Sequence, residues 1–390
     1  MGDLSAVRRW LAFGFVMLVV SSVTVVVGLA LMVATAWQLG LLYLAGGEKI
    51  IFDYAHQKDM NDPNDLRIDL EKAIRDDLNA AKRKDVDVFC ITHLDKDHIC
   101  RSSEIFWLEH ATTYQSDDRF KIKELWVPAC VILEDGLVDE SRVWRQEARH
   151  RLREGKGIRV FSRPEVLRKW LESQGLDFDS RKHLFVDAGT LVPTFNLGAH
   201  GVEFFAHSPF ASRLDSGELM DRNTDGIFMQ ATFEVLGKKT RLMLGADADH
   251  EVLSAIVDIT NYHGRPERLE WDVFKLPHHC SYLSLGQDKG AEETVPVDQV
   301  KELYETHGQR RGIIVSTSKP IPQTGSDTQP PHRQAANYYR RITGFNGLGG
   351  DFKVTMEHPR ASAPKPLVIE IDWIASALLQ AMRRSPNVVK

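Results

Sequence analysis

Short apolar runs that end in polar residues alternate along the chain with segments whose apolar residues recur at helical spacing. Residues 65–84 place Leu70, Ile74 and Leu78 on one face among charged residues, which predicts an amphipathic surface helix. Residues 86–92 have the apolar composition of a buried strand. The same reasoning predicts further strands at 41–44, 49–53, 202–207, 227–235, 241–244, 272–276, 312–316 and 367–372, and helices at 164–174, 251–259, 332–342 and 373–384. The body of the chain is therefore predicted to be an α/β domain.

The N-terminal segment 1–40 has a different texture, because residues 10–47 carry no charged side chain. The stretch 11–36 exceeds the roughly 20 apolar residues that span a bilayer, which predicts a membrane anchor. Arg8 and Arg9 lie just before this stretch, and the positive-inside rule would keep them on the cytoplasmic side. We therefore expect the protein to associate with a membrane through this segment.

Two alternatives to the anchor fit the same residues. The valine-rich part, 19–33, is also typical of a pair of buried strands, and residues 34–36 resemble a signal-peptidase site. Four cysteines are too few for a disulfide scaffold, so we expect free thiols in a reducing compartment such as the cytoplasm, at Cys90, Cys100, Cys130 and Cys280. An anchor with its arginines inside would place the body on the opposite side, so the side of the membrane stays open.

Composition and charge narrow the classes of function. The chain has 390 residues, of which 43% are hydrophobic and 26% are charged, enough for a substantial core without signs of low complexity. Its net charge of −5 argues against a generally basic coat for nucleic acid, although not against a local basic groove. Several of its 15 histidines occur in short clusters with aspartate, and these clusters carry the candidate chemistry.

The densest cluster follows the strand predicted at 86–92 and contains His93, Asp95, Asp97 and His98. Alternating positions of an extended or tightly turned backbone point His93, Asp95 and Asp97 to a similar side, and His98 completes the set. Imidazole and carboxylate groups are the common protein ligands of divalent transition metals. The spacing therefore predicts a metal site at the carboxyl end of a strand, where α/β sheets bind their ligands.

Three further predicted strands end in histidine or aspartate. His207 ends one of them, and Asp247 follows another after a glycine turn. Asp249 is better placed to cap the helix that follows it. The pair His278 and His279 follows a third strand. Each is ambiguous alone, since a lone histidine is often a structural hydrogen-bonding group, but together they favour one shared metal centre.

This order of motifs resembles the metallo-β-lactamase fold hydrolases, whose signature H-x-H-x-D-H is followed by His, Asp and His. The variant H-x-D-x-D-H is similar to the hydrolase domain of ComEC-type DNA-uptake proteins and their stand-alone relatives. Residues 51–53 match the strand and aspartate that precede that signature, and 244–247 match the L-x-G-D segment with one extra residue. Residues 277–281 match the "PHHGS" segment, with Cys280 in place of glycine.

The resemblance covers residues 41–372, with a mostly helical insertion at about 101–197 and a C-terminal helix and tail at 373–390. It implies an αββα four-layer sandwich with the site at one edge between the two sheets. One departure lies at residues 37–40, which do not reproduce the Gly-x-Gly-Asp turn between the first two strands of the family.

The resemblance also implies two divalent metal ions, zinc or manganese. Position by position it assigns the ligands as follows: His93, Asp95 and His207 for one ion, Asp97, His98 and His279 for the other, and Asp247 as the bridge. It gives catalytic roles to Asp97, Asp247 and His332. It places four residues where they would support the ligands or contact substrate: Asp53, His278, Ser281 and Lys319. For Ser281, Lys319 and His332, a turn serine, a solvated lysine and a helix-start histidine are equally good interpretations.

We therefore expect a binuclear metal-dependent hydrolase that cleaves a phosphodiester, in nucleic acid or a nucleotide, by metal-bound hydroxide. The carboxylate of Asp95 in place of an imidazole favours manganese or magnesium and phosphodiester substrates, although zinc remains open. Arg310, Arg311, Arg340 and Arg341, expected near the same edge, also favour a phosphate-bearing substrate. One alternative is a hydrolase of a small ester or lactone. The other is a membrane-anchored binding or assembly module with an inactive site.

Overall fold

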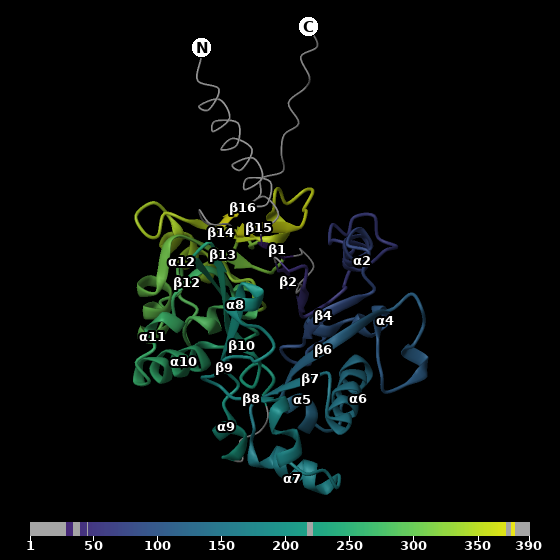
Figure 1. The fold of residues 1–390 in the computed structure, drawn as a ribbon. Helices are drawn as coiled ribbons and strands as arrows, with labels where there is room; N and C mark the ends of the chain where they lie inside the picture. Colours follow the sequence, from purple (N-terminus) through teal and green to yellow (C-terminus); the bar gives the residue numbers. More distant parts are fainter. Residues whose placement is uncertain (1–28, 34–39, 45, 217–220, 372–375, 379–390) are drawn as a thin grey trace, which may run out of the picture.

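A computed structural model of the chain describes residues 29–33, 40–44, 46–216, 221–371 and 376–378, and these residues form a mixed α/β fold with two β-sheets (Figure 1). In the described part of the chain, the large sheet has the strand order β16 (Ser376–Leu378), β15 (Leu367–Ile371), β1 (Leu29–Val33), β2 (Gly40–Tyr43), β3 (Lys49–Phe52), β4 (Asp85–Cys90), β6 (Phe120–Pro128), β7 (Ile158–Phe161) and β8 (Phe185–Val186), with β5 (Phe106–Trp107) paired to β6. The small sheet has the order β14 (Asp351–Val354), β13 (Gly308–Ser316), β12 (Trp271–Lys275), β11 (Lys238–Leu244), β10 (Phe228–Val235) and β9 (Val202–Ser208).

The two sheets pack against each other through their inner faces. The Trp126 ring of β6 meets the Phe204 ring of β9 edge to face, with ring centroids 5.3 Å apart. Phe52 of β3 lies 6.1 Å from the same Phe204 ring. These side chains belong to one buried apolar cluster with residues from both sheets, and burial of such surface is the main favourable term in folding.

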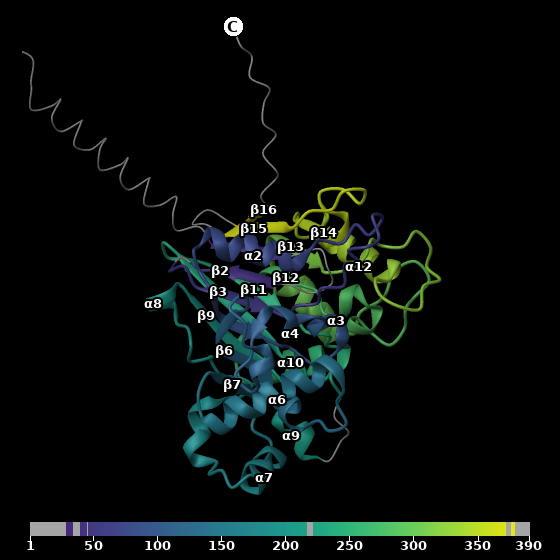
Figure 2. The same cartoon turned by 90° about the vertical axis from the view of Figure 1, so that its right-hand side faces the viewer.

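Helices cover the outer face of each sheet, as Figures 1 and 2 show. On the large sheet, Ile74 and Trp144 from two helices share a buried cluster with Phe89 of β4. On the small sheet, Val257 and Tyr339 from two others share a cluster with strands β10 to β13. The helices are α2 (Leu70–Ala80), α3 (Lys96–Ile99), α4 (Ser102–Ile105), α5 (Ala129–Leu133), α6 (Asp139–Glu154), α7 (Glu165–Ser173), α8 (Leu197–His200), α9 (Ala211–Asp215), α10 (His250–Tyr262), α11 (Asp298–Lys301) and α12 (Arg333–Thr343).

Most of the strands and helices predicted from the hydrophobic pattern are present, with ends displaced by a few residues. The helix expected at 65–84 is shorter, because Asp69 accepts a hydrogen bond from the Lys72 amide and caps α2 there. The residues 41–44 and 49–53 do form an antiparallel hairpin, as β2 and β3. The α/β class is confirmed.

The region 101–197 was expected to be a mostly helical insertion, and this is corrected in one respect. It does contain α5, α6 and α7, but it also supplies β5 to β8 of the large sheet. Strand β6 pairs in parallel with both β4 and β7, so it lies inside the sheet. The region is therefore an integral part of the sheet rather than an addition to it.

The two ends of the chain need separate treatment. Residues 29–33, within the proposed anchor, form β1 between β2 and β15, as the strand alternative for 19–33 expected for that part. Residues 1–28 and 34–39 lie outside the described residues, and the proposed cleavage site at 34–36 is among them. Within the described ranges, no helix has the length and apolar character that crossing a bilayer requires. At the other end, Ser376–Leu378 form strand β16, which corrects the helix expected at 373–384 for those residues; the rest of that prediction lies outside the described part.

Candidate metal centre

A cluster of imidazoles and carboxylates lies where strands of both sheets end. Asp97 and His98 follow β4 of the large sheet, on the short helix α3. Asp247 and His279 follow β11 and β12, which are parallel neighbours in the small sheet. Because parallel strands end at the same edge, loops after them bring distant residues together.

These four residues converge. One donor atom from each of Asp97, His98, Asp247 and His279 lies within 4.8 Å of the others. His98 Nε2 is 3.1 Å from Asp247 Oδ1. His279 Nε2 is 3.1 Å from Asp97 Oδ2 and 3.5 Å from Asp247 Oδ2. We call them the four-donor group; three of them are buried, and the set could hold a metal ion.

Partners on the outer nitrogens orient both imidazoles. His98 Nδ1 lies 2.9 Å from Asp53 Oδ2, and His279 Nδ1 lies 3.0 Å from the Thr317 carbonyl oxygen. Both partners are acceptors, so each Nδ1 donates its proton and each Nε2 faces the carboxylates. Asp53 also accepts from the amide and hydroxyl of Thr92, each at 2.8 Å. The predicted supporting contact of Asp53 is thus present, and carboxylate or carbonyl partners of this kind typically orient metal-binding histidines.

Protonated imidazoles balance the negative charges of the carboxylates in the four-donor group. Burial would lower the pKa of His98, but Asp247 and Asp53 raise it to about 9. Burial acts in the same direction on His279, and Asp247 and Asp97 raise its pKa to about 10. Burial opposes ionisation of Asp97, yet the neighbouring imidazoles lower its pKa to about 2, and they hold the pKa of Asp247 well below its usual range. Two imidazolium charges therefore occupy the place where a divalent cation would balance the carboxylates, so the residues fit such an ion.

His93 and Asp95 lie beside this group but are arranged differently. The buried His93 ring contacts the His98 ring, with centroids 3.7 Å apart. Burial and the His98 charge lower the pKa of His93 to about 4. Its Nε2 is 3.7 Å from Asp95 Oδ2, while Asp95 Oδ1 is paired with Arg222 Nη1 at 2.7 Å. Arg222 also pairs with Glu134. The Asp95 carboxylate, predicted to be a metal ligand, is therefore held by an arginine in this structure.

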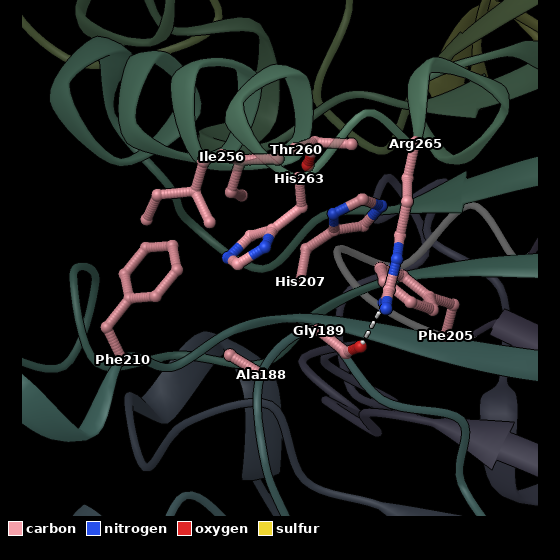
Figure 3. Close-up of a pocket in the computed structure, with 10 residues that line it drawn as sticks. Ala188, Gly189, Phe205, His207, Phe210, Ile256, Thr260, His263 and Arg265 are labelled. Atoms are coloured by element: carbon pink, nitrogen blue, oxygen red, sulfur yellow. Dashed lines mark hydrogen bonds between the residues drawn. The ribbon is translucent and has the colours of Figure 1, made fainter.

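His207 does not join the group, which corrects its predicted role as a ligand. Successive residues of a strand face opposite sides of the sheet, so Ala206 faces the other sheet and His207 faces α10. Its Nε2 donates to the Arg268 carbonyl at 3.0 Å. Figure 3 shows the ring between His263 and Arg265. These residues line a small cavity of about 150 Å³.

The segment 277–281 has an unusual backbone. His278, His279 and Cys280 have φ angles of 46°, 51° and 68°, in the left-handed region that favours glycine. This turn directs the His279 ring toward Asp97 and Asp247. The φ of Cys280 gives a physical reason for glycine at the matching position of the motif. His278 is not in the four-donor group, and its amide donates to the Ala246 carbonyl.

The remaining predicted residues fall into local structural roles or outside the group. Ser281 accepts from the Leu283 amide at 3.2 Å, as a turn serine does. His332 precedes α12, and its Nδ1 accepts from the Tyr282 amide at 3.4 Å. Lys319 is exposed in the loop after β13. Asp249 caps α10 by accepting from the Glu251 and Val252 amides, as predicted.

The four arginines expected near the active edge lie elsewhere. Arg310 and Arg311 occupy the first half of β13, away from the end that carries the metal-centre loops. Arg340 and Arg341 lie in the last turn of α12, whose first turn is the one near His332. Arg341 pairs with Glu293 at 2.8 Å. None of these four arginines is therefore placed at the strand ends that carry the four-donor group.

Sequence reasoning missed several residues that shape the site. Lys275 is buried at the end of β12, where its Nζ donates to the Gly245 carbonyl at 2.8 Å. Burial lowers its pKa, against the attraction of Asp53, Asp247 and Asp97. A lysine that ends an otherwise apolar strand next to two histidines was the available signal. Arg222 and Thr317 left no such signal, because their contacts depend on distant segments.

Comparison with known proteins adds no family. No protein-family model matches the chain, and no curated protein sequence matches it. The proposal below therefore depends on the residues of the site and on the resemblance of their motifs.

Proposed function

We propose that the protein is a metal-dependent hydrolase with the metallo-β-lactamase αββα fold, and that it cleaves a phosphodiester. The observation that carries this proposal is the convergence of Asp97, His98, Asp247 and His279 from two sheets, with both imidazoles oriented from behind. Helices outside two facing sheets, with a polar centre at their edge, support the family assignment. Such a donor set with a divalent ion is typical of hydrolases of this chemistry.

The four-donor group would hold one ion, which we propose to be zinc or manganese. His93 and Asp95 would hold a second together with Asp247, after Arg222 gives up its contact with Asp95. When bound, such cations supply Lewis-acid charge and lower the pKa of a water molecule. Asp53 and Thr317 keep the Nε2 atoms of the histidines turned toward the carboxylates. These contacts pre-organise the donors, so little reorientation is needed on binding.

The chain also offers groups for the substrate side of the reaction. His332 accepts from the Tyr282 amide through Nδ1, so its proton resides on Nε2. We propose that this Nε2–H protonates or hydrogen-bonds the leaving oxygen. Lys275 adds a buried positive charge on the small-sheet side of the centre. Both groups would favour a substrate on which negative charge develops.

The test combines metal analysis of the purified full chain with hydrolysis of bis(p-nitrophenyl) phosphate in manganese and in zinc. Asp247→Asn should remove most of the bound metal and lower the rate by at least about a hundredfold. Asp249→Asn is the matched control, because Asn also caps a helix and this carboxylate lies outside the four-donor group. The proposal fails if the chain binds no divalent ion, or if Asp247→Asn hydrolyses the diester as fast as the control. A metal-dependent activity on p-nitrophenyl acetate or a lactone, but not on the diester, would favour the small-ester alternative. A metal-bound chain inactive on all of them would favour the binding module.

We further propose that residues 11–28 anchor the chain in a membrane. Residues 29–33 are committed to the large sheet as β1, whereas 11–28 remain uncharged and reach the shorter end of the length that spans a bilayer. Deletion of residues 1–28 should then release the protein from the membrane fraction without detergent. The same protein in the membrane fraction after that deletion would contradict the anchor.

A further inference from the structure

A second cavity adjoins the metal centre through Asp97. It has a volume of about 600 Å³ and is open to solvent. One wall is formed by residues 56–59, which follow β3, together with Arg67. The other wall is formed by residues between Lys96 and Arg101. Since Asp97 belongs both to this wall and to the four-donor group, a ligand in the cavity would lie next to a bound metal.

Positive charge dominates the lining. Four basic side chains face two carboxylates, and the six residues are Lys58, Arg67, Lys96, Arg101, Asp59 and Asp97. Lys58 and Arg67 are already used, because Lys58 donates to two backbone carbonyls and Arg67 pairs with Asp65. Asp97 is turned to His279 at 3.1 Å.

Lys96 and Arg101 are the cations that remain for a ligand. In the described part of the chain, no hydrogen bond or ion pair holds the exposed Lys96 ammonium. Arg101 is paired with Glu104 at 2.8 Å, but both side chains are substantially exposed, so water screens the pair and a ligand can compete for the guanidinium. Both residues line the cavity together with Asp97: Lys96 from α3 and Arg101 from the position that precedes α4.

His56 adds a buried hydrogen-bond donor to this cavity. Its Nδ1 accepts from the Glu71 amide at 3.2 Å, so the proton resides on Nε2. Burial, together with the Arg101 charge, lowers the pKa of His56 and keeps the ring neutral at pH 7. Within the described ranges, the buried Nε2 has no hydrogen-bond acceptor. A buried donor without an acceptor is costly, and an oxygen-rich ligand would remove that cost.

We propose that this cavity is an anion subsite that binds a second phosphate group of the substrate, next to the phosphodiester at the metal centre. The proposal rests on the proposed hydrolase function. Lys96 and Arg101 provide the charge, and His56 provides a neutral N–H. A nucleotide-like diester that carries a second phosphate is therefore preferred to a diester with none, and to a neutral ester or lactone.

The test uses the full chain loaded with manganese and two substrates that differ by one phosphate. They are thymidine 5′-(p-nitrophenyl phosphate) and the same compound with a 3′-phosphate. The second should have a KM lower by about tenfold, since a charge-assisted contact contributes that order of affinity. In the double variant Lys96→Gln/Arg101→Gln, the KM values for the two substrates should become equal, and the kcat values for the two substrates should be similar to each other. Lys169→Gln, an exposed lysine on α7, is the control and should keep the tenfold preference.

Calorimetric titration with inorganic phosphate gives an independent measure of the subsite. Phosphate affinity should fall by about tenfold or more in the double variant, at unchanged manganese content, and should be unchanged in Lys169→Gln. Equal phosphate affinity in the double variant and wild type, or an unchanged substrate preference, would overturn the subsite. If no diester is hydrolysed, the hydrolase function fails, and the phosphate titration alone then decides whether this cavity binds anions.

Discussion

The carboxylate of Asp53 lies 2.9 Å behind the His98 ring, on Nδ1, while Asp247 lies 3.1 Å from Nε2 on the other side. The imidazole is thus held between two carboxylates from different sheets, and both of them stabilise its protonated form. A cation that replaces the Nε2 proton would keep the Asp53 contact unchanged. Asp53 therefore controls the orientation of a ligand without belonging to the four-donor group.

Asp53→Asn should weaken metal binding by about ten- to a hundredfold. The asparagine keeps the shape and can still accept from the Thr92 amide through Oδ1, but its NH₂ group cannot accept from His98 Nδ1–H. Competition with a chromogenic chelator measures the affinity, and Asp249→Asn again serves as the control. An affinity equal to that of the control would show that Asp53 has no role in the metal centre.

Asp97→Ala and Asp95→Ala should have unequal effects on metal content. Asp97 belongs to the four-donor group, whereas one carboxylate oxygen of Asp95 forms an ion pair with Arg222. Removal of Asp97 should abolish tight binding of the first ion. Removal of Asp95 should leave one ion bound and lose only a second. Elemental analysis of the two variants beside the wild type measures this, and loss of all metal in Asp95→Ala would contradict the arrangement.

Binding of a metal ion to the four-donor group near pH 7 should release about two protons. His98 and His279 have pKa values raised to about 9 and 10, so both are protonated in the metal-free protein and must lose the Nε2 proton to bind a cation. Because protons compete with the metal below these pKa values, apparent affinity should rise as the pH increases from 7 toward 9. Calorimetry in buffers with different ionisation enthalpies counts the released protons. A binding enthalpy independent of the buffer would refute the raised pKa values.

Glu147 and Arg151 provide a test of fold stability at residues outside the four-donor group. Both are buried on α6, with Glu147 Oε1 2.7 Å from Arg151 Nε. Burial opposes ionisation of Glu147, but His110 and Arg151 lower its pKa to about 2. Glu147→Gln removes the buried partner of Arg151, which keeps only a longer contact of 3.7 Å with the more exposed Glu109, and should cost about 3 kcal/mol of unfolding free energy at pH 7.

The pH dependence of that cost follows from the direction of the shift. A lowered folded-state pKa contributes stability that is present above the unfolded value near 4.5 and is lost as the pH falls toward 2. The difference in unfolding free energy between wild type and Glu147→Gln, measured by urea unfolding, should therefore become smaller as the pH is lowered from 5 to 3. Glu154→Gln, at the exposed end of the same helix, should show no comparable gap at any pH.

Cys280 should tolerate glycine better than valine. Its φ of 68° lies in the left-handed region, where a β-branched residue is strongly disfavoured. Cys280→Gly loses a buried sulfur but relieves about 1 kcal/mol of backbone strain, so its unfolding free energy should change by less than about 1 kcal/mol. Cys280→Val should cost at least about 2 kcal/mol. Cys130→Val is the control at a buried cysteine on α5 outside the left-handed region, and a cost there equal to that at Cys280 would exclude backbone strain as the cause.

The convergence of four donors could be predicted from sequence because each follows an apolar run that makes a strand. The rule that parallel strands end at one edge accounts for Asp247 and His279. Asp97 and His98 follow a strand of the other sheet, and their place in the same centre was implied by the resemblance of the motifs. His207 failed because both faces of β9 carry apolar side chains, such as Phe204 and Phe205. Alternation along such a strand does not tell which face points toward the other sheet.

Strand β6, which lies inside the large sheet, was not predicted although its pattern is visible in the sequence. Phe120 and Ile122 alternate with Lys121 and Lys123, which is typical of a half-exposed strand. The expectation of a mostly helical region holds for the charged residues of α6, but not for this strand. The Arg222 contact with Asp95 and the basic cavity beside Asp97 could not be foreseen, because they depend on how loops far apart in sequence meet after folding.

The four-donor group has a consequence for the molecule as a whole. Two of its members follow a strand of the large sheet, and two follow strands of the small one. An ion bound there would link the two sheets at the edge where these strands end, so the sheets could not separate at that edge without breaking bonds to the ion. Exchange of backbone amide hydrogens should then slow in both sheets together when the ion binds, and the protein would melt as one unit.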